Sequence, residues 1–301
     1  MELRGERDMS RKKPRWTTRL LNLDNPPIYA ILLIFMTLPL FYPLNTPVPV
    51  TAMATALYNK IESLKPGDVV LLDFSWLYSF KILHEAGHVA VLRHLLSKPG
   101  VKIVMVCFMA ADSELSWRDV MAKVDIEKNY PDKKYGKDWI WLGYIPGGEA
   151  TVLAFADNPW AIVPKDKYGT PIEQYPDFYN AVKTGADFAL VIEGGGHGGI
   201  NGHVTGGFLK SFGLKYHCWL AYNMDPSVIA EFYPYYPTII KSMLNGNAGA
   251  AEYERLLNMR GAGSVMVDAL SMTHLYALAL IVLINIVYLY DKYLSKPRSS
   301  R

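Results

Sequence analysis

The sequence predicts an α/β protein with a Rossmann-like, doubly wound and mostly parallel sheet, flanked by one transmembrane helix at each end. Two observations predict this class. Short apolar runs alternate with helical stretches through the middle of the chain, which is typical of βαβ units. Two longer apolar segments lie near the ends, at residues 28–44 and 267–290. We therefore expect residues 45–266 to form one α/β domain between two spans.

The two end segments concentrate the apolar residues of a chain that is 50% hydrophobic and 20% charged. A membrane span needs about 20 apolar residues. The second segment meets this, because it is uncharged from Ala269 to Tyr290 apart from the titratable His274. The first is short and contains Pro39 and Pro43, which bend or end a helix. It could be a cleaved signal peptide, but the small residues that would mark cleavage lie well beyond the apolar run, which favours an anchor.

The basic tails predict the orientation of the chain. Residues 1–27 carry seven Lys or Arg against four Asp or Glu, and residues 291–301 carry four against one. Short basic tails stay in the cytoplasm, whereas long loops are translocated largely regardless of their charge. We therefore expect a cell-membrane protein with both termini cytoplasmic and the central domain outside. The rest of the chain is acidic overall and shows no basic stripe, so nucleic acid is not expected as a partner.

Five apolar runs are the predicted strands of the central domain. Helical stretches separate them, and nearly every position of each run is apolar, as in strands that are covered on both faces. The runs are residues 69–74, 101–108, 139–145, 187–194 and 215–222. Cys107 and Cys218 lie in two of these runs and are expected to be buried free thiols.

The ends of these strands supply the candidate ligand-binding residues. In doubly wound folds, ligands bind outside the carboxyl ends of the parallel strands. Glycine-rich turns allow a ligand to approach the backbone closely, and the two glutamates among these residues suit a sugar, an amine or a metal better than a phosphate. The candidate residues are Asp73, Gly147, Gly148, Glu149, Glu193, Gly195 and His197. The alternative is that the glycines only form tight turns. His197 and His203, six residues apart in a glycine-rich loop, could bind a metal ion, but ordinary loop histidines are favoured.

Residues 84–88 read His-Glu-Ala-Gly-His, which matches the HExxH pattern of zinc metallopeptidases. In such a site His84 and His88 would bind zinc, and Glu85 would be the general base. His94 has the spacing of a third ligand, but Val91 replaces the glycine that would turn the chain towards the metal. A helical wheel places His84, Glu85 and His88 opposite the apolar stripe, so we expect a solvated helix face and no zinc cofactor. Zinc at this motif remains the alternative.

Five stretches resemble a family of two-span membrane proteins of bacteria and archaea that carry a Rossmann-like domain. The stretches are VLRHLLSK (91–98), LGYIPGGEA (142–150), YPYYP (233–237), GAAEYERLL (249–257) and VDALSMTHL (267–275). The resemblance extends from the first span to the last and implies the same architecture. It implies no activity, ligand or catalytic residue.

Two functions follow as expectations. The first is a membrane-anchored, extracytoplasmic and non-catalytic module that binds a small ligand or a partner protein. The lipid bilayer and other membrane-protein subunits are its expected partners, and the tyrosine-rich residues 231–237 suit an interface. The second is a zinc metallopeptidase that uses residues 84–88.

Overall fold

A computed structural model describes residues 16–21, 25–195 and 203–294. It divides into two compact units. One unit comprises residues 45–267, and the other comprises the two ends of the chain, residues 1–44 and 268–301.

The first unit is built on one six-stranded sheet in which every pairing is parallel. The strand order is β3-β2-β1-β4-β5-β6. The strands are β1 (Val69–Asp73), β2 (Lys102–Cys107), β3 (Trp139–Tyr144), β4 (Phe188–Gly195), β5 (Leu220–Met224) and β6 (Ile240–Asn245). This order is that of a doubly wound Rossmann-like sheet, so the predicted α/β class is confirmed.

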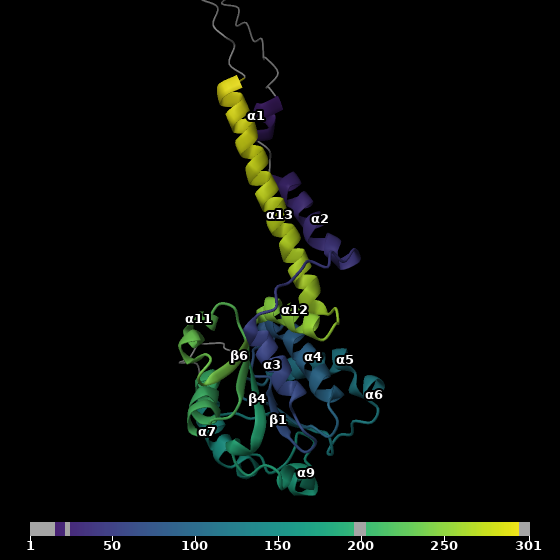
Figure 1. Cartoon of the computed structure of the whole chain (residues 1–301), viewed down its shortest axis with the longest axis vertical. Coiled ribbons are helices and arrows are strands. Elements are labelled where there is room, and N and C mark those ends of the chain that lie inside the picture. The colour runs from purple at the N-terminus through teal and green to yellow at the C-terminus, as the bar shows by residue number, and fades with distance from the viewer. Residues whose placement is uncertain (1–15, 22–24, 196–202, 295–301) are drawn as a thin grey trace, which may run out of the picture. The chain divides into compact units, whose positions relative to one another are not determined.

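Helices cover both faces of the sheet and give two hydrophobic cores (Figure 1). One face packs against α3 (Ala52–Glu62), α4 (Lys81–Ser97), α5 (Ser113–Val124) and α12 (Gly246–Leu256). The other packs against α7 (Gly148–Asp157), α10 (His203–Phe208) and the π-helical η4 (Leu209–Lys215). The shorter elements are η1 (Tyr78–Phe80), α6 (Ile126–Asn129), α8 (Pro159–Ile162), η2 (Ile172–Gln174), α9 (Pro176–Tyr179), η3 (Gly185–Asp187), α11 (Ile229–Phe232) and η5 (Tyr233–Tyr235).

The strands are apolar throughout because their side chains alternate between the two cores. In β1, Val69 and Leu71 lie in the core with α7, whereas Val70 and Leu72 lie in the core with α3 and α4. Cys107 and Cys218 are buried and free, as predicted.

The structure differs from the sequence prediction at the far edge of the sheet. Residues 209–215 continue as η4, so β5 begins only at Leu220, and β6 was not predicted. Lys241 and Ser242 interrupt the apolar pattern of β6, which is an edge strand.

The tyrosine-rich segment before β6 is only partly available to a partner. Phe232 is fully buried, and Tyr235 and Tyr236 pack against the core with α7, while Tyr233 is 50% exposed. Glu231, Pro234 and Pro237 are also exposed, and the interface expected at residues 231–237 stays a prediction.

The second unit contains α1 (Trp16–Leu21), α2 (Asn25–Phe41), most of α13 (Ala262–Leu289) and η6 (Tyr290–Leu294). Its two chain segments run antiparallel (Figure 1). Leu44 N–H donates to Asp268 Oδ2 at 3.2 Å, Tyr276 Oη donates to Ile28 O at 2.9 Å, and Thr17 Oγ1 donates to Asp291 Oδ1 at 2.8 Å.

One helix in the described ranges is long and apolar enough to cross a membrane. It covers residues 262–293, and only 6% of its most apolar 18-residue stretch is buried. The apolar stretch of α2, Pro26–Phe41, is shorter. The second predicted span therefore has the required helix, and the first remains a prediction.

Candidate functional site

The topology places the candidate site where β1 and β4 lie side by side. The chain leaves β1 towards α4 on one face of the sheet, and it leaves β4 towards α10 on the other face. In doubly wound folds, ligands bind outside the carboxyl ends of strands whose connections diverge in this way. Asp73 ends β1, and Glu193 lies close to the end of β4.

Asp73 is a fully buried carboxyl group held by the loop after its own strand. Its Oδ2 accepts from Ser75 N–H at 3.0 Å and from Gly194 N–H at 3.3 Å, and Ser75 Oγ lies 2.5 Å from Oδ1. Burial outweighs these hydrogen bonds and raises the pKa of Asp73 to about 8. The carboxyl group is therefore largely protonated at neutral pH.

Glu193 is also fully buried and contacts the opposite helical layer. Its Oε1 accepts from Thr205 Oγ1 at 2.9 Å, and Tyr222 Oη donates to the carbonyl of Thr205 at 3.2 Å. The structure thus brings Asp73 and Glu193 to neighbouring strand ends, one tied to the loop after β1 and the other to α10.

Two glycines at the end of β4 allow the backbone to pack closely here. A Cβ on Gly194 would lie 2.6 Å from Asp73 O, from His88 Cε1 and from the Trp76 ring. A Cβ on Gly195 would lie 2.6 Å from Ser75 O. At the end of β4, Gly194 and Gly195 allow the backbone to pack closely against residues 73–76.

The histidines of the HExxH motif point towards the same carboxyl ends of the strands, so the expected solvated helix face is wrong. His84, Glu85 and His88 are all buried. His88 Nε2 lies 2.8 Å from the Asp73 carbonyl, and its Nδ1 lies 2.7 Å from Asn223 Nδ2. Because a carbonyl only accepts and the amide nitrogen only donates, Nε2 carries the proton and Nδ1 accepts. Burial lowers the pKa of His88 to about 3, so the ring is neutral.

His84 and Trp76 complete this buried cluster. His84 Nδ1 lies 3.1 Å from the carbonyl of Asn223, and Asn223 Nδ2 donates to the carbonyl of His84 at 2.7 Å. The Trp76 ring lies 5.4 Å from the ring of His84 and 4.4 Å from that of His88, centroid to centroid. The end of β1 and the loop after it, the start of α4 and the end of β5 are therefore joined in one network. Its members are Asp73, Trp76, His84, His88 and Asn223.

The predicted orientation of α4 was wrong because the face of this helix that meets the sheet is not its most hydrophobic face. That face contains His84, Gly87, His88 and Val91, spaced i, i+3, i+4 and i+7. Val91 packs in the apolar core, but the first turns of α4 lie over the strand ends, where Asn223 supplies polar partners. A Cβ on Gly87 would lie 2.7 Å from Asn223 Oδ1. The face of α4 that meets the sheet is therefore polar over the strand ends and apolar at Val91, over the core.

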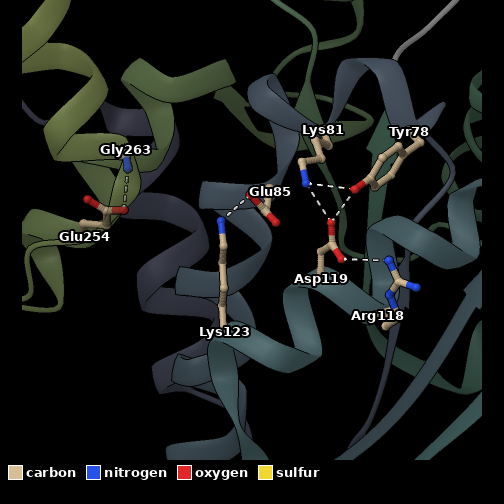
Figure 2. A network of polar contacts seen from close by, with 8 residues as sticks. All are labelled: Tyr78, Lys81, Glu85, Arg118, Asp119, Lys123, Glu254 and Gly263. Carbon is tan, nitrogen blue, oxygen red and sulfur yellow. Dashed lines mark hydrogen bonds and ion pairs between the residues drawn. The ribbon is translucent and has the colours of Figure 1, made fainter. Parts of the chain in front are cut away.

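Glu85 points elsewhere, towards α5 (Figure 2). Its Oε2 pairs with Lys123 Nζ at 2.5 Å. Lys81, one turn earlier, pairs with Asp119 Oδ2 at 2.7 Å, and Tyr78 Oη donates to the same oxygen at 2.8 Å. The hydrogen bond from Lys81 is the main cause of the lowered pKa of Asp119. These contacts join α4 to α5.

The other predicted site residues that the structure describes belong to a different turn of the chain. Gly147 and Gly148 have positive φ and form the turn from the edge strand β3 into α7. Glu149 follows them, and its Oε1 pairs with Lys210 Nζ at 2.6 Å. His197 lies outside the described residues.

Asn223 was not among the candidate ligand-binding residues, and neither Trp76 nor Ser75 was predicted to belong to a site. A signal for Asn223 existed: it follows an apolar run in a fold whose first helix carries two histidines on one stripe. No sequence feature indicated that Trp76 would fold back onto that helix.

Within residues 16–21, 25–195 and 203–294, no three His, Cys, Asp or Glu side chains converge as metal ligands. Comparison with protein-family models, curated proteins and solved structures finds no match.

Proposed function

We propose that this chain is a membrane-anchored α/β module that binds a small polar ligand, without catalysis, at the carboxyl ends of β1 and β4. The observation that carries the proposal is the pair of buried carboxyl groups, Asp73 and Glu193, at the point where the chain connections diverge. Carboxyl oxygens accept hydrogen bonds, and a protonated carboxyl group also donates one, so a ligand with hydroxyl or amine groups suits the site best.

The geometry of α4 argues against the metallopeptidase alternative. A zinc peptidase needs both histidines directed at one zinc ion and the glutamate directed at the water bound to that ion. Here both ring nitrogens of His88 are engaged by protein atoms, and Glu85 is paired with Lys123. Zinc binding through His88 would break one of two buried hydrogen bonds, which costs free energy.

The antiparallel pairing in the second unit supports the proposed topology. Thr17 lies against Asp291, so the first and last described helical segments meet at the same end of α13. With the basic tails, this favours both termini in the cytoplasm and residues 45–267 outside.

A titration tests the ligand proposal. The purified full chain in detergent is titrated calorimetrically with a panel of monosaccharides, polyamines and free amino acids. We expect saturable binding of one class, weakened about tenfold or more in Glu193→Gln, because leaving a buried donor of the ligand without its acceptor costs about 1–3 kcal/mol. Glu173→Gln, an exposed glutamate in η2, is the matched control and should bind normally. Binding that survives unchanged in Glu193→Gln, or no binding across the panel, contradicts the proposal.

A further inference from the structure

Helix α13 carries one polar side chain in the middle of an otherwise apolar stretch. Asn285 lies between Ala277 and Tyr290, where every other residue is apolar or a tyrosine. Its side chain is exposed, and its Nδ2 donates to the carbonyl of Ile281 in the same helix at 2.8 Å. Across the part of the chain that the structure describes, no hydrogen bond reaches its Oδ1.

Asn285 faces away from α2. Tyr276, Leu280 and Leu283 of α13 line an apolar cavity of about 320 Å³ together with Ile28 and Ile31. At about 100° per residue, Asn285 lies roughly 180° around the helix from Tyr276. Its neighbours on that side are apolar and exposed: Leu278 (61%), Ile281 (57%) and Val282 (56%).

The depth of Asn285 makes this exposure costly in a membrane. The uncharged stretch runs from Ala269 to Tyr290, so Asn285 lies about 8 Å from its midpoint at a rise of about 1.5 Å per residue. The hydrocarbon core extends about 15 Å on each side of the midpoint. Lipid offers no donor to Oδ1, and an unpaired polar atom in hydrocarbon is unfavourable.

We propose that α13 pairs with α13 of a second copy of this chain through Asn285, with Leu278, Ile281 and Val282 packing around the contact. A second copy is the occupant that matches the chemistry. Every copy inserts with the same orientation, so the two Asn285 side chains lie at the same depth. A carboxamide both donates and accepts, so it is complementary to itself across a two-fold axis. This inference rests on the proposed membrane anchoring.

Energy transfer between labelled full-length chains in phosphatidylcholine vesicles tests the pairing. The dissociation constant of the dimer, as a mole fraction in lipid, should rise about 3- to 30-fold in Asn285→Leu. Asn285→Gln keeps a carboxamide, so its dissociation constant should stay close to that of the wild type. A monomeric wild type at every protein-to-lipid ratio, or an unchanged constant in Asn285→Leu, overturns the proposal.

Cysteine cross-linking tests the face independently. Ile281→Cys lies on the Asn285 side, Leu283→Cys faces α2, and the two native cysteines are buried. Oxidation should give a disulfide-linked dimer with Ile281→Cys and far less with Leu283→Cys; equal yields overturn the assigned face. Extraction of the wild-type chain by alkaline carbonate would show instead that membrane anchoring had failed, and it would overturn both proposals.

Discussion

His88 and Asn223 form a buried hydrogen bond, 2.7 Å between Nδ1 and Nδ2, that joins α4 to the carboxyl end of β5. The same imidazole donates to the carbonyl of Asp73 at the end of β1. One side chain thus links the helix to two strands that flank β4 in the sheet. These contacts give His88 a structural role in a helix whose glutamate is directed towards α5.

Gly87→Ala should destabilise the protein although alanine favours helix. The new Cβ would lie 2.7 Å from Asn223 Oδ1, and overpacking of this kind costs about 1–3 kcal/mol against a propensity gain of about 1 kcal/mol. Chemical denaturation in detergent measures the net loss. In an Asn223→Ala background the contact is gone, so the same substitution should become neutral or stabilising. Equal effects in both backgrounds would show that Asn223 is not what limits position 87.

Asp73→Asn should change how stability depends on pH. Burial raises the pKa of Asp73 to about 8 from the ordinary aspartate value of 3.8. Between these values the folded state binds more protons than the unfolded state, so this group stabilises the fold at low pH and loses that contribution as pH rises from about 4 to 8. Asparagine cannot ionise, so the free-energy difference between wild type and variant should vary with pH across that window. A constant difference would mean that Asp73 is ionised in the fold.

Glu254→Gln should loosen the start of α13. Glu254 is buried and accepts from the backbone N–H of Gly263 (Figure 2). It also accepts from the backbone N–H groups of Gly261 and Ser264 and from Ser264 Oγ. A carboxylate at a helix N-terminus satisfies donors that lack partners within the helix. We expect a loss of at least about 2 kcal/mol.

Hydrogen exchange at the Gly263 and Ser264 amides should accelerate at least tenfold in that variant. Glu127→Gln, on the exposed side of α6, is the control and should leave these amides unchanged. Unchanged exchange in Glu254→Gln would show that α13 begins stably without the carboxylate.

Protease protection tests the topology. Protease added to right-side-out vesicles should digest residues 45–267 and spare epitope tags on both tails, because the basic tails are expected to be cytoplasmic. Digested tags with a protected domain would reverse the orientation, and one digested tag would mean that only one of α2 and α13 spans the membrane.

The pattern of apolar residues along the sequence was enough to predict the class of the sheet and the bounds of four strands to within about two residues. Strands covered on both faces are uniformly apolar. The pattern was not enough for β6, an edge strand interrupted by Lys241 and Ser242, or for the strand order, which depends on contacts between distant residues. Asp73 and Glu193 could be named as strand-end residues because the fold class fixes which end carries ligands. The surroundings of His88 could not be predicted, because its partner Asn223 lies 135 residues away in the chain.

Metal content per chain tests most directly whether the HExxH histidines are structural in a binding module. Purified wild-type chain is exposed to a mild chelator, dialysed and analysed for zinc beside His88→Ala. Since both ring nitrogens of His88 are hydrogen-bonded within the protein, we predict well under one zinc per wild-type chain and no difference in the variant. One tightly held zinc per chain that is lost in His88→Ala would contradict this account and favour the metallopeptidase.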